Sequence, residues 1–436
     1  MKKRNILIFL LSVFLFAACS QTDATPRAEG QEATALVEEQ IPAEPPEESN
    51  GITDGPYTNA DTPCKPFNIF TQQFGAPALN LPVITDADLV IGPENATVTF
   101  IEYSQLTCPA CASFEPLLVA IQEQYPEDVR LVYRHFLFQE KSEITAQALE
   151  AAAKQGKFSE FKNYMFDRRS KNVENPEHTN LPDDAFWGSV AENDLDEWLE
   201  DYLGELGIDQ NQFFEDMYST EIIEKIKATS EVAEVLMLNS TPTLYVNGRL
   251  WAQEVPRDFG TLSLFIQILK TQDKEYNECP PNKIQSNIDY SATISTTKGD
   301  FIVDLFEEIA PVTVNSFIFL AQEGWYDNLP FFVTSDLALS GDLSDTTYGG
   351  PGYAIIDEFS DDQSLNDIGK LATYSLAPGI NGSSFIINKS TQENQKDLTI
   401  FGEVTEGMDI VNALELRENI FSPVIDRILK VTINEK

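Results

Sequence analysis

The spacing of apolar and polar positions divides the chain into three regions. Residues 20–63 contain few apolar side chains and many Glu, Pro, Ala and Thr residues, so they predict no packed core. From about Asp88, apolar runs of strand and helix periodicity follow one another. From about Ile288, short strands, one clear helix and closely spaced glycines take their place. We expect an unstructured tether, an α/β domain and a mainly-β domain, in that order.

The α/β region predicts three strands and a series of helices. β-Branched and aromatic residues concentrate at 96–102, 129–134 and 243–246, and an Asn247-Gly248 turn follows the last strand. Apolar residues at helical spacing predict helices over 114–125, 143–155, 158–166, 186–203, 220–238 and 259–269. This order favours an α/β sandwich with a helical insertion.

The third region predicts a β-barrel or a β-sandwich. A Lys298-Gly299 turn separates strands expected over 291–296 and 300–305, and a helix over 312–323 starts after Pro311. Short strands with frequent glycine turns are typical of closed or layered β-sheets.

Length and charge limit the function classes. At 436 residues the chain is too long for one ordinary core, which agrees with two domains. Its formal net charge of −41 argues against a nucleic-acid partner, because phosphate binding needs clustered Lys and Arg. The same charge argues against adhesion of the protein surface to an anionic membrane.

The first residues predict export and a lipid anchor. A basic start, Lys2-Lys3-Arg4, precedes an apolar run at 6–16 that is too short to span a bilayer. The run leads into Phe16-Ala17-Ala18-Cys19, which resembles the lipobox of bacterial lipoproteins. The resemblance implies a signal peptide over 1–19, lipidation of Cys19 and anchoring outside the cytoplasm on the bacterial cell membrane. An ordinary cleaved signal with an incidental cysteine is the alternative.

Four further cysteines predict two disulfides. The close spacing of Cys108 and Cys111 favours one pair, which leaves Cys64 with Cys279. A Cys64–Cys279 bond would join the entry of the first domain to its exit, and two unpaired thiols are the alternative. We expect the first domain over 64–280 and the second over 281–436.

The Cys108-Pro109-Ala110-Cys111 motif predicts thiol–disulfide exchange. It stands at a predicted strand-to-helix junction, where free N–H groups and the helix dipole favour a thiolate on the first cysteine. Cys108 would be the nucleophile and Cys111 the resolving cysteine. A zinc site would need further ligands, and a purely structural disulfide is another alternative. We expect no metal and no cofactor.

Three segments of the first region resemble the DsbA-like branch of the thioredoxin superfamily. They are Phe100–Cys111, Val132–Phe136 and Ser240–Gly248, and the resemblance covers about residues 64–275. It implies a thioredoxin fold with a helical insertion and a protein thiol–disulfide oxidoreductase. Its expected partners are exported client proteins with cysteines and a membrane redox partner that recycles the pair.

The resemblance also implies roles for single residues. Pro242 matches the cis-proline whose loop lies against the cysteine pair, with Thr241 and Pro109 in contact with the client. Glu102 matches a buried acid that handles the proton of the resolving cysteine; a surface charge is the alternative. The motif lacks the histidine of the strongest oxidants, so the direction of electron flow is open. His135 is expected to pack within its strand rather than to catalyse.

The second region is similar to cyclophilin-type peptidyl-prolyl isomerases. The similar segments, in order, are Thr297–Leu305, Ala310–Leu320 with Gly324–Tyr326, Ser340–Asp342, Gly349–Tyr353, Asn381–Phe385 and Ile400–Asp409. The resemblance implies an eight-stranded closed barrel with helices at its ends.

The isomerase residues of that family are replaced here. Val333 stands where the family has the arginine that polarises the amide, and Leu339 replaces a glutamine. The other altered positions are Ser384, Ile386 and Leu398. Because no cation meets the amide, weak or absent isomerase activity is expected; an intact isomerase is the alternative.

Three functions follow from these observations. The first is a membrane-anchored oxidoreductase of exported clients. The second is a foldase that acts mainly as a prolyl isomerase, with a secondary redox domain. The third is a client-binding lipoprotein that is not an enzyme.

Overall fold

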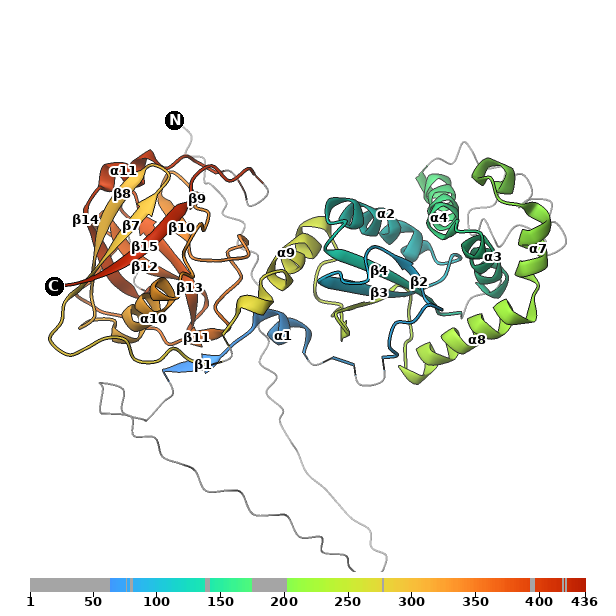
Figure 1. Cartoon of the computed structure of the whole chain (residues 1–436), viewed down its shortest axis with the longest axis horizontal. Coiled ribbons are helices and arrows are strands. Elements are labelled where there is room, and N and C mark those ends of the chain that lie inside the picture. Colours follow the sequence, from blue (N-terminus) through green and yellow to red (C-terminus); the bar gives the residue numbers. More distant parts are fainter. Residues whose placement is uncertain are drawn as a thin grey trace, which may run out of the picture. The chain divides into compact units, whose positions relative to one another are not determined.

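The computed structural model describes two β-sheets with their helices (Figure 1). The residues described are 63–75, 77–78, 81–137, 142–174, 202–276, 278–392, 397–417, 419 and 422–436. Cys19 and most of the helix expected over 186–203 lie outside these ranges. Among the residues described, no helix combines the length and the apolar character needed to cross a membrane.

The first sheet is a five-stranded mixed sheet. Its order is β2 (Leu89–Ile91), β4 (Val129–His135), β3 (Val98–Ser104), β5 (Thr243–Val246) and β6 (Arg249–Leu250). β3 and β4 are parallel, and the other pairs are antiparallel. The Asn247-Gly248 turn joins β5 to β6 with positive φ at both residues, as the sequence predicts.

Helices cover both faces of this sheet. Their bounds are α1 (Ile69–Phe74), α2 (Pro109–Gln124), α3 (Ser142–Lys154), α4 (Phe158–Glu174), α7 (Gln210–Met217), α8 (Thr220–Val235) and α9 (Phe259–Leu269), followed by the short 3-10 helix Gln272–Lys274. Phe100 on β3 packs with α1, α2 and α9, whereas its neighbour Ile101 packs on the opposite face with α8. This alternation of adjacent residues between two apolar layers is what a buried strand requires.

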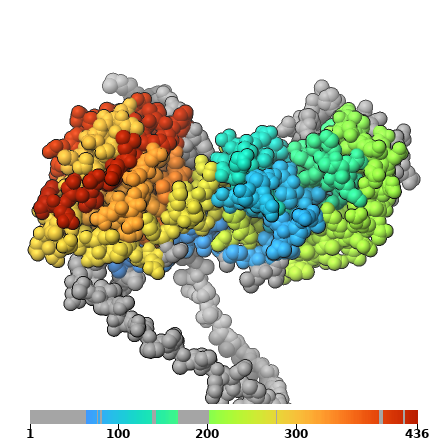
Figure 2. Space-filling model, viewed as in Figure 1, coloured from blue at the N-terminus to red at the C-terminus, as the bar shows by residue number. Residues whose placement is uncertain are grey.

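The helical insertion forms its own core beside the cysteine pair. α3, α4, α7 and α8 bury a cluster that also includes Cys108 and Cys111. In Figure 2 the green segments of α7 and α8 gather together on the surface. The predicted helices over 143–155, 158–166, 220–238 and 259–269 are present, whereas α7 was not predicted.

The second sheet closes into the expected eight-stranded barrel. Its strands are β7 (Tyr290–Thr296), β8 (Gly299–Leu305), β9 (Phe332–Val333), β10 (Leu337–Ser340), β12 (Lys370–Ala377), β13 (Ile380–Asn388), β14 (Ile400–Glu406) and β15 (Ile428–Glu435). The pairing runs β9-β10-β13-β12-β14-β8-β7-β15. A bridge between Pro330 and Arg427, with backbone bonds beside it, joins the two ends of this path. Closure leaves few unpaired strand edges.

The barrel interior is filled by alternate strand residues and by α10 (Pro311–Gln322). Ala292, Ile294, Phe301 and Val303 are all buried in this core. A short helix, α11 (Met408–Ala413), follows β14.

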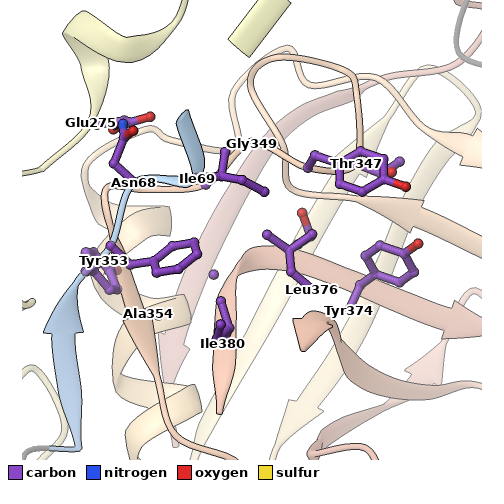
Figure 3. Close-up of a pocket in the computed structure, with 15 residues that line it drawn as sticks. Asn68, Ile69, Glu275, Thr347, Gly349, Tyr353, Ala354, Tyr374, Leu376 and Ile380 are labelled. Atoms are coloured by element: carbon purple, nitrogen blue, oxygen red, sulfur yellow. Dashed lines mark hydrogen bonds between the residues drawn. The ribbon is translucent and has the colours of Figure 1, made fainter. Parts of the chain in front are cut away.

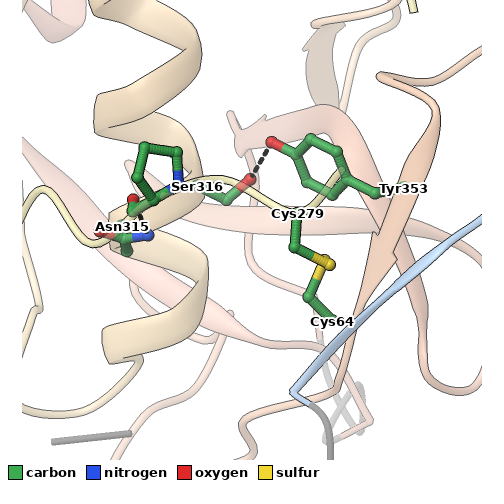
Figure 4. Close-up of a disulfide and its surroundings, with 6 residues drawn as sticks. Cys64, Cys279, Asn315, Ser316 and Tyr353 are labelled. Carbon is green, nitrogen blue, oxygen red and sulfur yellow. Dashed lines mark hydrogen bonds between the residues drawn. A yellow bond between two sulfur atoms is a disulfide. The ribbon is translucent and has the colours of Figure 1, made fainter. Parts of the chain in front are cut away.

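The N-terminal strand adds to the barrel sheet. β1 (Cys64–Pro66) pairs antiparallel with β11 (Tyr353–Ile355), which in turn pairs with β13. Cys64 forms a disulfide with Cys279, across a sequence separation of 215 residues (Figure 4). The bond joins the segment that enters the first domain to the segment that leaves it, and Cys64 packs against the barrel core.

Polar contacts hold the residues after Cys279 to α10. The Asn315 side chain donates to the carbonyl of Pro281 at 3.1 Å and accepts from the backbone N–H of Lys283 at 2.5 Å. The next residue on the helix, Ser316, shares a buried hydrogen bond of 2.9 Å with Tyr353 Oη of β11 (Figure 4). Both ends of the first domain are therefore connected to the barrel.

Candidate active site

The start of α2 places the sulfur of Cys108 at a helix N-terminus. Cys108 is the N-cap residue, and its Sγ accepts a hydrogen bond from the backbone N–H of Cys111 at 3.3 Å. Pro109 occupies the first helical position, where its missing N–H costs no hydrogen bond. The sulfur thus takes the place of the side-chain oxygen that normally caps a helix, where negative charge is stabilised.

A cis peptide bond brings a second segment to the same sulfur. The bond between Thr241 and Pro242 is cis, immediately before β5. Cys108 Sγ lies 3.4 Å from the carbonyl oxygen of Thr241. Because β5 pairs with β3, the strand that leads into Cys108, residues far apart in the sequence meet at one point of the sheet.

The two thiols have very different proton affinities. Hydrogen bonding from the Cys111 thiol, and then from Thr241 and the backbone N–H groups of Cys111 and Ala110, lowers the pKa of Cys108 to about 6, although burial opposes this shift. Burial, donation to Cys108 and the nearby charge of Glu102 raise the pKa of Cys111. Near neutral pH one sulfur is a thiolate and the other a thiol, as exchange through a mixed disulfide requires.

Access to the pair is limited to one side. Cys108 is 4% exposed and Cys111 is fully buried, whereas Pro109 and Ala110 between them are exposed. A client can therefore approach Cys108 past the start of α2 and the Thr241–Pro242 segment. The buried sulfur of Cys111 is reserved for reaction with Cys108.

Glu102 lies in the sheet behind the cysteine pair. It is 3% exposed, and its Oε1 has no hydrogen-bond partner among the residues that the structure describes. Burial, and then the charge of Glu115, raise the pKa of Glu102 to about 7, while Lys162 acts in the opposite direction. A buried carboxyl with this pKa can accept a proton near neutral pH, and its charge acts on Cys111.

Two residues that the sequence analysis missed complete this buried group. Lys162 Nζ on α4 lies 2.8 Å from Glu115 Oε1 on α2, with both side chains at most 4% exposed. Lys162 and Glu102 also line one small pocket. Glu115 follows Cys111 by four residues, so helical spacing alone could have placed it on the face of Cys111.

His135 packs within its strand, as expected. Its Nε2 lies 3.0 Å from Glu150 Oε1, and Lys225 binds the other oxygen of the same carboxylate. Both His135 and Glu150 are buried. No group of three or more potential metal ligands occurs among the residues described.

The altered isomerase positions fall into different places on the barrel. Val333 packs in the barrel core, whereas Leu339, Ile386 and Leu398 join a second apolar cluster with Phe332. Ser384 is buried and contributes to two shallow pockets.

Arg417, an arginine beside this region, is already bound to a carboxylate. The backbone N–H of Arg417 donates to the carbonyl of Val333 at 2.9 Å. Its guanidinium binds both carboxylate oxygens of Asp345, at 2.6 and 2.7 Å. The positive charge is therefore engaged with a carboxylate rather than presented to a substrate amide.

A further pocket lies on the barrel (Figure 3). Tyr374, Leu376 and Ile380 contribute to its lining, together with Asn68 and Glu275. Asn68 donates to Glu275 at 2.6 Å, and burial raises the pKa of this carboxyl to about 7.

Titration of the reduced protein tests the asymmetry of the two thiols. In a Cys19→Ser background we expect the first thiol to ionise near pH 6, because the Cys111 thiol and the N–H groups at the start of α2 donate to the sulfur of Cys108. With Cys108→Ala, and with the Cys64–Cys279 disulfide kept intact, no thiolate should form near pH 6, because the pKa of Cys111 is raised. With Cys111→Ala the backbone donor stays but the thiol donor is lost, so the Cys108 pKa should lie between about 6 and the value of about 8.5 for free cysteine. Thiolate absorbance near 240 nm measures each step; a first ionisation near about 8.5, as in free cysteine, would contradict the assignment.

Replacement of Glu102 tests its role as a base. In the wild type, the rate at which Cys111 resolves a Cys108–glutathione mixed disulfide should rise as pH passes through about 7. Glu102→Gln should remove this rise and slow resolution at pH 8 by about 100-fold. Quenched-flow trapping of the mixed disulfide measures the rate. The control is Glu123→Gln, which alters an outer residue of α2; equal profiles for Glu102→Gln and wild type would exclude the base.

Glu102→Gln should also change the free energy of unfolding, in a direction that follows from the raised pKa of Glu102. The folded-state pKa of Glu102 is raised from 4.5 to about 7, so its contribution to stability is lost as pH rises through this range. Glu102→Gln should therefore be more stable than wild type at pH 8, by at most about 3 kcal/mol, and show no such difference at pH 4.

Comparison with known proteins agrees with both sheets. Residues 85–267 match the family described as Thioredoxin. Residues 291–433 match the family described as cyclophilin type peptidyl-prolyl cis-trans isomerase/CLD. The two matched ranges contain the five-stranded sheet and the barrel strands β7 to β15, respectively.

Curated relatives match only part of the chain. The Na(+)/H(+) antiporter NhaA 1 of Mycolicibacterium vanbaalenii is 30% identical over 172 residues, which cover 38% of this chain and 24% of that protein. The antiporter NhaA of Herminiimonas arsenicoxydans is 28% identical over 189 residues, 42% of this chain and 27% of that protein. The chain spans about a quarter of the length of these relatives.

Solved structures resemble one part of the chain or the other. A cyclophilin type isomerase from Cryptosporidium parvum is 23% identical, covers 34% of this chain and 98% of its own, and has a TM-score of 0.31. A thioredoxin-like oxidoreductase from Silicibacter pomeroyi is 24% identical, covers 38% of this chain and 83% of its own, and has a TM-score of 0.30. BdbD from Bacillus subtilis is 21% identical, covers 45% of this chain and 97% of its own, and has a TM-score of 0.35. With the two family matches and the two folds, the chain is a thioredoxin-like domain fused to a cyclophilin-type domain.

Proposed function

We propose that this protein is a membrane-anchored thiol–disulfide oxidoreductase that acts on exported proteins outside the cytoplasm. One observation carries the redox part: a sulfur with a lowered pKa caps α2, beside a cis-proline segment and a buried resolving thiol. The expected partners are client proteins with cysteines and a membrane protein that restores the redox state of the pair.

The proposed exchange uses three groups in sequence. The Cys108 thiolate attacks a client disulfide, so that a mixed disulfide forms and one client sulfur leaves as a thiolate. Cys111 then gives its proton to the Glu102 carboxylate and attacks Cys108 Sγ. The mixed disulfide breaks, the second client thiolate leaves, and Cys108 and Cys111 are left as a disulfide. The reverse sequence oxidises a client dithiol.

The proposed location is supported by the sequence and by one structural feature. The Lys2-Lys3-Arg4 start and the segment ending in Cys19 are typical of a lipoprotein signal, although they lie outside the residues described. The Cys64–Cys279 disulfide is typical of compartments in which disulfides persist. An acidic tether over 20–63 would let the folded domains reach clients from the membrane.

A redox assay of the full chain tests the proposal. Wild type should reduce insulin or oxidise a reduced test protein, and Cys108→Ala should abolish both activities because the attacking sulfur is missing. Cys111→Ala should instead accumulate a mixed disulfide with the client. Free thiols and mass spectrometry report these outcomes. A Cys108–Cys111 bond that does not exchange even with glutathione would support the non-enzymatic alternative.

The reduction potential of the Cys108–Cys111 pair determines whether the protein reduces or oxidises its clients. A value of about −270 mV would indicate a reductase, and one of about −120 mV would indicate an oxidant.

We further propose that the cyclophilin-type domain has weak or no isomerase activity and serves to bind or position clients. Its support is that Val333 lies in the core and that Arg417 is engaged with Asp345. Without a donor to the isomerising amide, a barrier of about 18–20 kcal/mol is not lowered. Two domains on one chain would still help each other, because a client held by one domain meets a higher effective concentration of the other.

A proline-peptide isomerisation assay tests this second proposal. The full chain should give the uncatalysed cis–trans rate at all enzyme concentrations. Cys108→Ala provides the control, because it removes redox chemistry from the measurement. A rate that grows in proportion to protein concentration and survives Cys108→Ala would instead favour a prolyl-isomerase foldase.

A further inference from the structure

The surface around Cys108 contains one charged group whose role the exchange chemistry does not explain. Pro109 and Ala110 are exposed, and Thr241 and Pro242 are partly exposed. None of these four residues carries a charge. Arg257, in the loop between β6 and α9, is also partly exposed and contacts this segment.

Two contacts fix the position of Arg257. Its Nη1 donates to the carbonyl oxygen of Pro242 at 3.0 Å, one peptide unit beyond the carbonyl that lies next to Cys108 Sγ. Its guanidinium carbon lies 5.9 Å from the centre of the Phe114 ring on α2. The cation is therefore anchored between the cis-proline segment and the helix that carries both cysteines.

Most N–H groups of Arg257 have no hydrogen-bond partner among the residues that the structure describes. A guanidinium has five N–H groups, and the bond to Pro242 uses one. By contrast, the buried arginines Arg134 and Arg417 are each held by both oxygens of a carboxylate, Asp88 and Asp345 respectively. In the described part of the chain, no carboxylate forms an ion pair with Arg257.

The neighbouring acids do not supply the missing partner. Asp258, the next residue, caps α9 by accepting from the backbone N–H of Thr261 and from its hydroxyl. Glu102 is buried in the sheet, and burial lowers the pKa of Arg257 against the opposing charges of Glu102 and Cys111. A partly desolvated cation without a counter-ion is stabilised when a bound molecule brings a carboxylate next to it.

We propose that Arg257 is a client-recognition residue, whose remaining N–H groups bind a carboxylate next to the client cysteine that exchanges with Cys108. The inference rests on the proposed exchange reaction and names a preferred client class: cysteines flanked by Asp or Glu. A client sulfur that reaches Cys108 passes the Thr241–Pro242 segment, which places adjacent client residues close to Arg257. The preference acts locally, against the net charge of −41 that repels acidic clients as a whole.

Cysteine peptides of equal net charge test the proposal on the full chain. One peptide carries Glu beside the cysteine, its isomer carries the same Glu six residues away, and glutathione serves as a small reference thiol. The exchange rate of oxidised wild type with the first peptide should exceed that with its isomer roughly five- to tenfold. High salt should reduce this ratio, because screening weakens an exposed ion pair.

Two variants and one control separate recognition from folding. Arg257→Gln should bring the ratio of the two rates close to one, and Arg257→Lys should retain part of it, because the charge remains without the planar donor pattern. Arg249→Gln is the matched control: Arg249 is also partly buried and donates to a backbone carbonyl, that of Gly75. This variant should keep the full ratio.

The outcomes distinguish the recognition proposal from the redox proposal. Equal rates for the two peptides in wild type, with active glutathione exchange, would overturn the role of Arg257 and leave the oxidoreductase intact. A ratio that persists in Arg257→Gln would do the same. If neither the peptides nor glutathione exchange, the redox proposal fails, and the recognition proposal falls with it.

Discussion

Hydrogen bonding from Cys111 to the sulfur of Cys108, from its thiol and from its backbone N–H, is the interaction on which the redox chemistry depends. It exists because the chain leaves β3 and starts α2 with a sulfur in the capping position. A helix start offers unpaired N–H groups, and a thiolate satisfies them better than a thiol does. The same geometry buries the second sulfur, so one local structure produces both an ionised and a protonated cysteine.

The helical insertion contributes to the electrostatics behind this helix start. Glu102 comes from the central strand and Glu115 from α2, whereas the cation that offsets them, Lys162, comes from α4. Two buried carboxyls without a cation would both be strongly disfavoured as anions. By supplying one positive charge, the insertion keeps the pKa of Glu102 close to neutral instead of leaving the group permanently protonated.

Local signals in the sequence predicted the elements that local interactions define. The strand over 243–246 and the helix over 259–269 have the expected bounds, because an Asn-Gly turn and a capping Asp258 mark their ends. The helix expected from residue 114 begins at Pro109, since apolar spacing is visible only after the cysteine motif. The three-residue strand β1 has no such signal, because its pairing with β11 depends on residues almost three hundred positions away.

The residues of the candidate active site also divide into those with a local sequence signal and those without one. Cys108, Cys111, Glu102 and Pro242 could be identified from motifs, and the structure brings the strand, the helix start and the cis-proline segment together. The contacts of Lys162 and Arg257 join elements that are distant in the sequence, so neither residue has a local signature. Val333, expected to replace the catalytic arginine of the cyclophilin family, is buried in the barrel core, where strand alternation places it.

The Cys64–Cys279 bond also has a mechanical meaning. It makes the whole redox domain a covalently closed loop, with both ends of the loop meeting at one pair of sulfurs. Tension applied to the residues before Cys64 would pass through this bond directly into the barrel, and would not stretch the chain in between. A pull on the N-terminal segment would thus leave the geometry around the reactive sulfur undisturbed.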